Sequence, residues 1–112
     1  MLQIIGYKSC NETKKAIRFC KERSISHHFV DLNERKLSLG EWNKIFNAVN
    51  SELLISIESQ YYKKEGYVWR SYDAKEELME HPQLLKTPLL KLKEKVKVGF
   101  DEQFLASLES PL

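Results

Sequence analysis

Residues 2–20 read LQIIGYKSCNETKKAIRFC, and two structural patterns follow one another within them. The apolar run at 2–7 is typical of a short buried strand. From Asn11 onward, small and apolar residues recur at the spacing of one helix face with cations between them, which predicts an amphipathic helix ending near Ser24. Residues 25–32, ISHHFVDL, predict a second strand. A strand, a helix and a strand in this order form a βαβ unit, so we expect the two strands to be parallel.

The middle of the chain carries three further patterns. Ser38 and Glu41 have the spacing of a capping box, which predicts the start of a second helix. Residues 51–70 show no regular period, and we expect an irregular surface segment there. Asp73 has the position of a cap for a short helix, which should end before Pro82 because the residue preceding a proline disfavours helical geometry.

The last part of the chain returns to strands. Residues 88–92 and 95–100 alternate apolar residues with lysine, which predicts a tight antiparallel hairpin. Asp101 can cap a final helix. The element order is then β-α-β-α-(α)-β-β-α, with parallel strands first and a hairpin later. We therefore predict an α/β protein of thioredoxin-like architecture (β-α-β-α-β-β-α), with an extra helical insertion and a mixed four-stranded sheet, as a single domain over 1–112.

Composition argues against several classes of protein. The 112 residues include 18 Lys and Arg against 16 Asp and Glu, a formal charge of +2 that gives no reason to expect nucleic acid as a direct partner. No apolar run approaches the ~20 residues of a membrane span. Two cysteines are too few for a disulfide scaffold. We expect a cytoplasmic protein that binds no membrane.

Cys10 stands between the first predicted strand and the first predicted helix. The unpaired N–H groups and the positive dipole end of a helix favour a thiolate at this position, and Lys8 is close in sequence. Two interpretations remain open on position alone. Cys10 is either a nucleophile of lowered pKa or a half-buried structural cysteine at a turn.

Thr13 occupies the place where a C-x-x-C redox pair carries its second cysteine. A monothiol site of this kind needs an outside thiol for any redox cycle, and glutathione is the usual cytosolic one. Thr13 can equally be a small polar residue in the first helical turn. Cys20 lies on the apolar face of the same helix, roughly 15 Å from Cys10 at about 1.5 Å per residue, too far for a disulfide.

The other side chains that could bind a metal or a ligand do not form a recognisable site in the sequence. His27 and His28 are neighbours on a strand and face opposite sides, and no zinc-type spacing is visible, so we expect no metal. The segment 61–70 combines aromatic residues with lysine. It could stack ligands, or it could cover the edge of the sheet.

Five short motifs carry a family resemblance: KSCNETKKA at 8–16, WR at 69–70, HP at 81–82, KTPL at 86–89 and VGF at 98–100. In this order they resemble the arsenate reductase C / Spx family of the glutaredoxin-linked type, and most closely its short YffB-type branch. The resemblance implies a thioredoxin-like fold with Cys10 as the active-site thiolate. It also implies a cis peptide bond at Thr87-Pro88, with the Thr87 backbone opposite Cys10.

The same resemblance suggests what surrounds the thiolate and what reacts with it. Substrate-binding positions would be Lys8, Asn11, Thr13, Arg70, Thr87 and Pro88. No bound cofactor is implied, and glutathione or a glutaredoxin-type reductant would act as co-substrate. The alternative is an Spx-like module that binds a protein such as RNA polymerase without catalysis.

Three positions depart from the arsenate reductases of the family. Thr87 stands where those enzymes have an arginine before the proline, Glu65 aligns with another arginine, and no basic residue follows Gly99. Arg70 is then the one arginine left for an oxyanion that prefers forked donors. We expect an arsenate-reductase-like thiol oxidoreductase that does not reduce arsenate itself.

Overall fold

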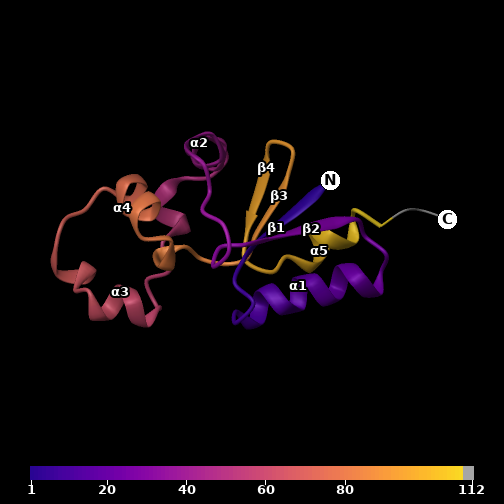
Figure 1. Cartoon of the computed structure of the whole chain (residues 1–112), viewed down its shortest axis with the longest axis horizontal. Coiled ribbons are helices and arrows are strands. Elements are labelled where there is room, and N and C mark those ends of the chain that lie inside the picture. The colour runs from indigo at the N-terminus through magenta and orange to yellow at the C-terminus, as the bar shows by residue number, and fades with distance from the viewer. Residues whose placement is uncertain (110–112) are drawn as a thin grey trace. The chain divides into compact units, whose positions relative to one another are not determined.

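The computed structural model describes residues 1–109 (Figure 1). The chain forms two compact units. The first unit contains Met1–Leu37 together with the chain from Thr87 onward, and the second contains Ser38–Lys86. That the whole of 1–112 forms one domain stays a prediction. Among residues 1–109, no helix has both the length and the apolar character that a membrane crossing requires.

A mixed four-stranded sheet forms the centre of the first unit. Its order is β2-β1-β3-β4, with β1 at Leu2–Gly6, β2 at His27–Asp31, β3 at Leu89–Leu92 and β4 at Lys95–Val98. β1 and β2 are parallel, whereas β3 is antiparallel to both β1 and β4. The predicted βαβ unit and the predicted hairpin are both confirmed.

Two helices of the first unit pack against the sheet. They are α1 (Asn11–Glu22) and α5 (Glu102–Ala106), which Figure 1 shows on one side of the strands. The predicted cap of α5 is confirmed, since the carboxylate of Asp101 accepts the Phe104 N–H at 3.0 Å. The buried residues of this apolar core are Leu2, Ile4, Ala16, Cys20, Ile25, Leu90 and Leu105.

The strand register brings three chain segments to one edge of the sheet. Gly6 at the end of β1 pairs with Asp31 at the end of β2. Because β3 runs antiparallel to β1, with Ile5 opposite Leu89, the residues just before β3 lie beside the residues just after β1. This edge is where any site built on Cys10 must form.

The second unit consists of short helices. α2 (Leu39–Ala48) begins at the predicted capping box, in which Ser38 Oγ accepts the Glu41 N–H at 3.2 Å and the Glu41 carboxylate accepts the Ser38 N–H at 2.9 Å. α4 (Ala74–Glu80) begins at Asp73, whose carboxylate accepts backbone N–H groups of the first turn. Both predicted helices are confirmed.

The prediction for residues 51–70 was wrong. This segment contains a 3₁₀ turn at Ser51–Leu54, the helix α3 at Gln60–Lys64 and a second 3₁₀ turn at Tyr67–Trp69. Helices of three to five residues are too short to show a periodic pattern, which is why the sequence looked irregular. Leu54 is fully buried, and its carbonyl accepts the Lys86 N–H at 2.7 Å.

The aromatic residues of this segment are mostly part of the interior. Tyr62 and Tyr67 are buried and stacked with ring centroids 5.5 Å apart, and Tyr72 meets Tyr67 edge-on at 5.1 Å. Trp69 is different, because 89% of its surface is exposed. The segment is therefore not an exposed aromatic surface, and a ligand could stack only on its exposed part.

Candidate active site

Cys10 is held at the start of α1 by backbone hydrogen bonds on both sides. Its N–H donates to the Tyr7 carbonyl at 3.0 Å, which closes the turn after β1. Its carbonyl accepts the Lys14 N–H at 3.0 Å, the first bond of the helix. Cys10 is thus the N-cap residue, and its half-buried thiol stands where the helix presents unpaired N–H groups.

Thr87 lies next to this thiol, as the strand register requires. The Cys10 Sγ is 3.6 Å from the Thr87 carbonyl oxygen and donates a hydrogen bond to it. The Thr87-Pro88 peptide bond is cis, which confirms what the family resemblance implied. Two segments 77 residues apart in the sequence, linked there only by the family resemblance, are thus in direct contact.

The pKa of the Cys10 thiol is lowered from its ordinary value. Partial burial by itself raises this pKa, because it disfavours the charged form. Hydrogen bonds from the hydroxyls of Thr13 and Thr87, and from the backbone N–H groups of Thr13 and Glu12, outweigh the burial. Each of these donors stabilises a thiolate, so the site favours the nucleophilic form of Cys10.

Thr13 is fully buried beside Cys10, and its hydroxyl makes no geometrically defined hydrogen bond within residues 1–109. A buried polar group left unpaired costs about 1–3 kcal/mol, so such a group calls for an explanation. The thiolate supplies one, because a negatively charged sulfur accepts the Thr13 O–H. We therefore expect the hydroxyl to have a partner when Cys10 is a thiolate and none when Cys10 is a neutral thiol.

Gly6 makes this position of Thr13 possible. A Cβ atom built on Gly6 would lie 2.5 Å from the Thr13 Oγ1, closer than real Cβ contacts allow. Only a residue without a side chain lets α1 approach the end of β1 this closely. Gly6 was not predicted to have a role, although a glycine in a strand is a recognised sign of close backbone approach.

The charge of Lys8 is already compensated by two carboxylates. Its Nζ lies 3.9 Å from the buried Asp31 and 3.6 Å from Glu34. Lys8 is not among the groups that lower the pKa of Cys10. Asn11, the other neighbour proposed for substrate binding, is exposed as the first residue of α1.

Arg70 belongs to the second unit, where its guanidinium has two partners. It lies 3.6 Å from the Glu77 carboxylate and 4.1 Å from the centre of the Tyr67 ring. An arginine engaged in this way has its positive charge matched by a carboxylate. Glu77 could not be found from the sequence, because no local pattern links it to a residue seven positions earlier.

Cys20 is a core residue, as its place on the apolar helix face predicts. Its side chain is fully buried, and burial raises the pKa of its thiol. Both cysteines are free. The pKa shifts of the two thiols therefore have opposite directions, lowered at Cys10 and raised at Cys20.

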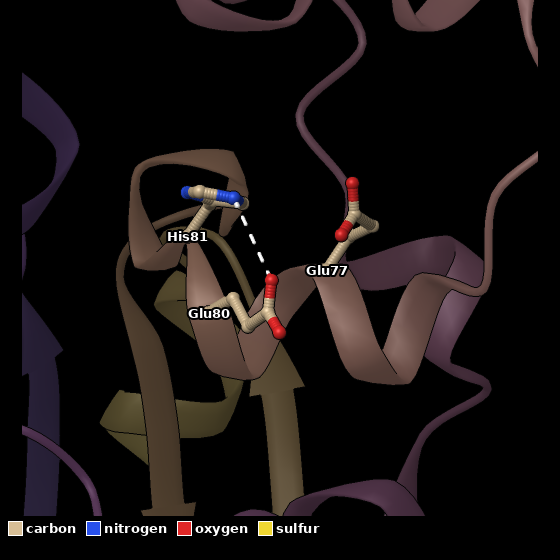
Figure 2. A group of neighbouring side chains, drawn as sticks. All are labelled: Glu77, Glu80 and His81. Carbon is tan, nitrogen blue, oxygen red and sulfur yellow. Dashed lines mark ion pairs between the residues drawn. The ribbon is translucent and has the colours of Figure 1, made fainter.

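Within residues 1–109, one group of three side chains could in principle hold a metal ion: Glu77, Glu80 and His81 (Figure 2). Glu80 and His81 form an ion pair of 3.9 Å when the imidazole is protonated. Glu77 is committed elsewhere, because it pairs with Arg70 and accepts a hydrogen bond from Tyr67, whose pKa is raised to about 12 by burial and by this contact. We assign no metal to this group.

The sheet order, the cysteine at the helix start and the cis-proline beside it together define a protein of the thioredoxin-like class. The family model described as the ArsC family matches residues 5–107. The chain belongs to the ArsC family.

Individual relatives agree with this assignment over nearly the whole chain. An uncharacterized protein of Haemophilus influenzae is 26% identical over 107 residues, covering 92% of this chain and 94% of that protein. The structure of a YffB protein superposes with a TM-score of 0.85 at 19% identity, covering 98% and 100% of the two chains. An arsenate reductase (ArsC) related protein from Brucella melitensis gives a TM-score of 0.74 at 26% identity, covering 94% and 92%. The predicted α/β, thioredoxin-like fold of the YffB type is confirmed.

Proposed function

We propose that this protein is a monothiol oxidoreductase with Cys10 as its nucleophile and glutathione as its co-substrate. The observation that carries the proposal is the set of donors around the Cys10 sulfur, which lowers its pKa in spite of burial. Membership of the ArsC family supports the same chemistry, because family members include arsenate-reductase-like proteins. A glutathione-rich reducing compartment such as the cytoplasm suits the reaction.

The reaction is two successive thiol–disulfide exchanges. In the first, the Cys10 thiolate attacks the glutathione sulfur of a mixed disulfide R–S–S–G, forms Cys10–S–S–G and releases R–S⁻, which takes a proton. In the second, the thiolate of another glutathione attacks Cys10–S–S–G, releases the Cys10 thiolate and leaves glutathione disulfide. The substrate sulfur is reduced, the glutathionyl group of the substrate and one incoming glutathione become glutathione disulfide, and Cys10 returns unchanged. No second protein cysteine takes part, because Cys20 is buried in the core.

Neighbouring residues have distinct roles in this proposal. The hydroxyls of Thr13 and Thr87 hold the thiolate, both before the attack and when Cys10 acts as leaving group. The backbone of Thr87, fixed by Pro88, offers hydrogen bonds to the main chain of the bound thiol compound. Asn11 and Lys8 are the other substrate-binding positions near Cys10 in the sequence, although the charge of Lys8 is matched by Asp31 and Glu34.

Arsenate is not part of the proposal. A tetrahedral oxyanion needs forked cationic donors, and the residue beside Cys10 is a neutral threonine at position 87. Arg70 has its charge matched by Glu77. Neutral hydroxyl donors suit a sulfur centre better than an arsenate ion.

The test compares Cys10→Ser with the matched variant Cys20→Ser. Wild type and Cys20→Ser should oxidise glutathione in the presence of 2-hydroxyethyl disulfide, with glutathione disulfide followed by coupled NADPH consumption. Cys10→Ser should lose this turnover. If Cys10→Ser kept full activity, the proposed function would be wrong, and if dithiothreitol fully replaced glutathione, the co-substrate would be wrong.

The exposed Trp69, with 65% of its neighbour Val68 also exposed, supports a second candidate function. A protein partner such as RNA polymerase would cover these two side chains, and catalysis would not be needed. Trp69→Ala would then weaken capture of purified RNA polymerase, and Cys10→Ser would not. The buried Tyr62 cannot contribute to this surface.

A further inference from the structure

An open hollow of about 360 Å³ runs along the exposed side of α1 in the first unit. Three of its residues repeat at the helical spacing i, i+4 and i+7, so they form a single stripe on the helix surface. We name Lys14, Arg18 and Lys21 the basic stripe. The hollow is lined by Lys8, Lys14, Ile17, Arg18, Lys21 and Glu22.

The basic stripe carries charge that the described part of the chain does not compensate. All three of its side chains are exposed, and none makes an ion pair within residues 1–109. Glu22 is the one acidic residue that lines the hollow. The whole chain has a net charge of only +2, so this stripe is a local concentration of positive charge that attracts an anionic partner.

The stripe continues from the active site. Cys10 is the N-cap of α1, and Lys14 and Arg18 follow it at i+4 and i+8, on the same side of the helix. At about 1.5 Å per residue, the stripe begins roughly 6 Å from Cys10 and ends roughly 16 Å from it. An anion held along the stripe would therefore extend away from a sulfur bound at Cys10.

The length of the basic stripe distinguishes an extended peptide from glutathione as its ligand. An extended peptide advances about 3.3 Å per residue, so about five residues span the distance from Cys10 to Lys21. Glutathione has one residue on each side of its cysteine and reaches less than about 10 Å, which covers Lys14 but not Lys21. The half-buried Ile17 also gives the hollow an apolar floor, which suits a peptide better than a phosphate backbone.

We propose that the basic stripe docks an extended acidic segment of a protein substrate whose cysteine exchanges its disulfide with Cys10. The inference rests on the proposed function, and it names the substrate class. The substrate is a protein whose oxidised cysteine is followed or preceded, within about five residues, by Asp or Glu. In the exchange, the Cys10 thiolate attacks the sulfur of the docked protein cysteine in protein–S–S–G, instead of the glutathione sulfur, forms Cys10–S–S–protein and releases the glutathione thiolate, which takes a proton. A glutathione thiolate then attacks the Cys10 sulfur, releases the reduced protein cysteine and leaves Cys10–S–S–G, which the second exchange described above resolves to glutathione disulfide.

Two synthetic peptides test this inference. Both carry a central cysteine activated as a mixed disulfide with 5-thio-2-nitrobenzoate, one with Asp and Glu in the flanking positions and one with Lys. The rate of aryl thiolate release measures attack by Cys10. At low salt the acidic peptide should react about 10-fold faster than the basic one, and added sodium chloride should reduce the ratio.

A matched pair of triple variants assigns the effect to the stripe. Lys14→Gln/Arg18→Gln/Lys21→Gln should abolish the preference, whereas Lys36→Gln/Lys93→Gln/Lys95→Gln removes the same charge from other exposed positions and should retain it. The inference is overturned if wild type shows no preference, or if both triple variants lose it equally. It is also overturned if a single-stranded oligonucleotide binds wild type as tightly as the acidic peptide.

The uncharged substrate 2-hydroxyethyl disulfide shows whether the docking site or the monothiol chemistry is wrong. If Cys10 reduces the neutral disulfide but shows no preference between the peptides, the docking site is wrong and the monothiol chemistry stands. If Cys10 fails with the neutral disulfide, the chemistry is wrong. Fluorescence anisotropy of an acidic peptide with serine in place of cysteine then tests the stripe alone, and equal binding by both triple variants would overturn it.

Discussion

The sulfur of Cys10 lies 3.6 Å from the carbonyl oxygen of Thr87, a residue 77 positions further along the chain. The contact follows from topology, because the antiparallel pairing of β1 with β3 puts the residue after one strand beside the residue before the other. Thr87 presents both its carbonyl and its hydroxyl to the sulfur. The carbonyl accepts the S–H of the neutral thiol, and the hydroxyl donates to the thiolate. Thr87 therefore hydrogen-bonds to Cys10 in both protonation states of the cysteine.

Alkylation across a pH series should distinguish the two cysteines. A lowered pKa means that Cys10 is a thiolate at pH values where an ordinary thiol is still protonated, so its reaction with iodoacetamide should begin at lower pH. Cys20 is buried with a raised pKa and should react only after unfolding. Mass spectrometry of each peptide measures both rates. An ordinary titration midpoint at Cys10 would contradict the arrangement of donors described above.

The same pKa shift predicts a pH dependence of stability. A thiol whose pKa is lower in the folded than in the unfolded protein stabilises the fold above its unfolded pKa, and this contribution is lost as pH falls through the folded pKa. Cys10→Ala should therefore flatten the rise in the free energy of unfolding through that window. Urea unfolding at a series of pH values measures it. A slope equal to that of wild type would mean that the thiolate is not stabilised by the fold.

The residue beside the sulfur should decide whether oxyanions bind. With a threonine at position 87, arsenate should cause no oxidation of glutathione by wild type and should not protect Cys10 from alkylation. Thr87→Arg adds a forked cationic donor there, and arsenate or sulfate should then slow the alkylation of Cys10. Thr87→Gln is the neutral control of similar reach. Arsenate-dependent turnover by wild type would contradict this prediction.

Much of the fold could be predicted because its signals are local. Each confirmed element depends on residues a few positions apart. These elements are the strand before Cys10, the helix caps at Ser38, Asp73 and Asp101, and the hairpin of β3 and β4. Residues 51–70 were mispredicted for the opposite reason. Their helices are a single turn or little more, and what holds them is the packing of tyrosines that come together only in the folded unit.

The features of the candidate site also fall into those with a local sequence signal and those that depend on tertiary contacts. The position of Cys10 at a helix start could be read from sequence, because both neighbouring elements have clear patterns. The buried hydroxyl of Thr13 and the bare backbone of Gly6 could not, since each matters only through a contact across the strand–helix junction. The commitment of Arg70 to Glu77 was equally invisible, because it depends on how two short helices meet.

Gly6→Ala should loosen the junction between β1 and α1. The added Cβ would lie 2.5 Å from the Thr13 Oγ1, so the helix start must shift, at an expected cost of about 1–3 kcal/mol in the free energy of unfolding. Gly40→Ala is the matched control, because the nearest atom to its Cβ is the Ser38 Oγ at 3.9 Å and alanine favours the helix by up to about 1 kcal/mol. Denaturant unfolding compares the two. Equal effects would mean that the close approach at Gly6 does not constrain the fold.

Thr13→Val should make the protein more stable and less reactive at once. Valine has nearly the shape of threonine but no hydroxyl, so it removes a buried group that is unpaired while Cys10 is a neutral thiol, and this should add about 1 kcal/mol to the free energy of unfolding below the pKa of Cys10. The same change removes a donor to the thiolate, so the pKa of Cys10 should rise and its alkylation near neutral pH should slow.

Thr13→Ser separates the hydroxyl from the shape of the side chain. Serine keeps the O–H donor and loses a methyl group from a buried position, so it should preserve the lowered pKa of Cys10 while reducing stability. Stability changes of opposite sign in the two variants, with slower alkylation of Cys10 only in Thr13→Val, would assign the hydroxyl to the thiolate, because a purely structural threonine would lose stability in both. If Thr13→Val left the alkylation profile of Cys10 unchanged, the buried hydroxyl would have no part in the chemistry, and its lack of a partner would be a cost of packing alone.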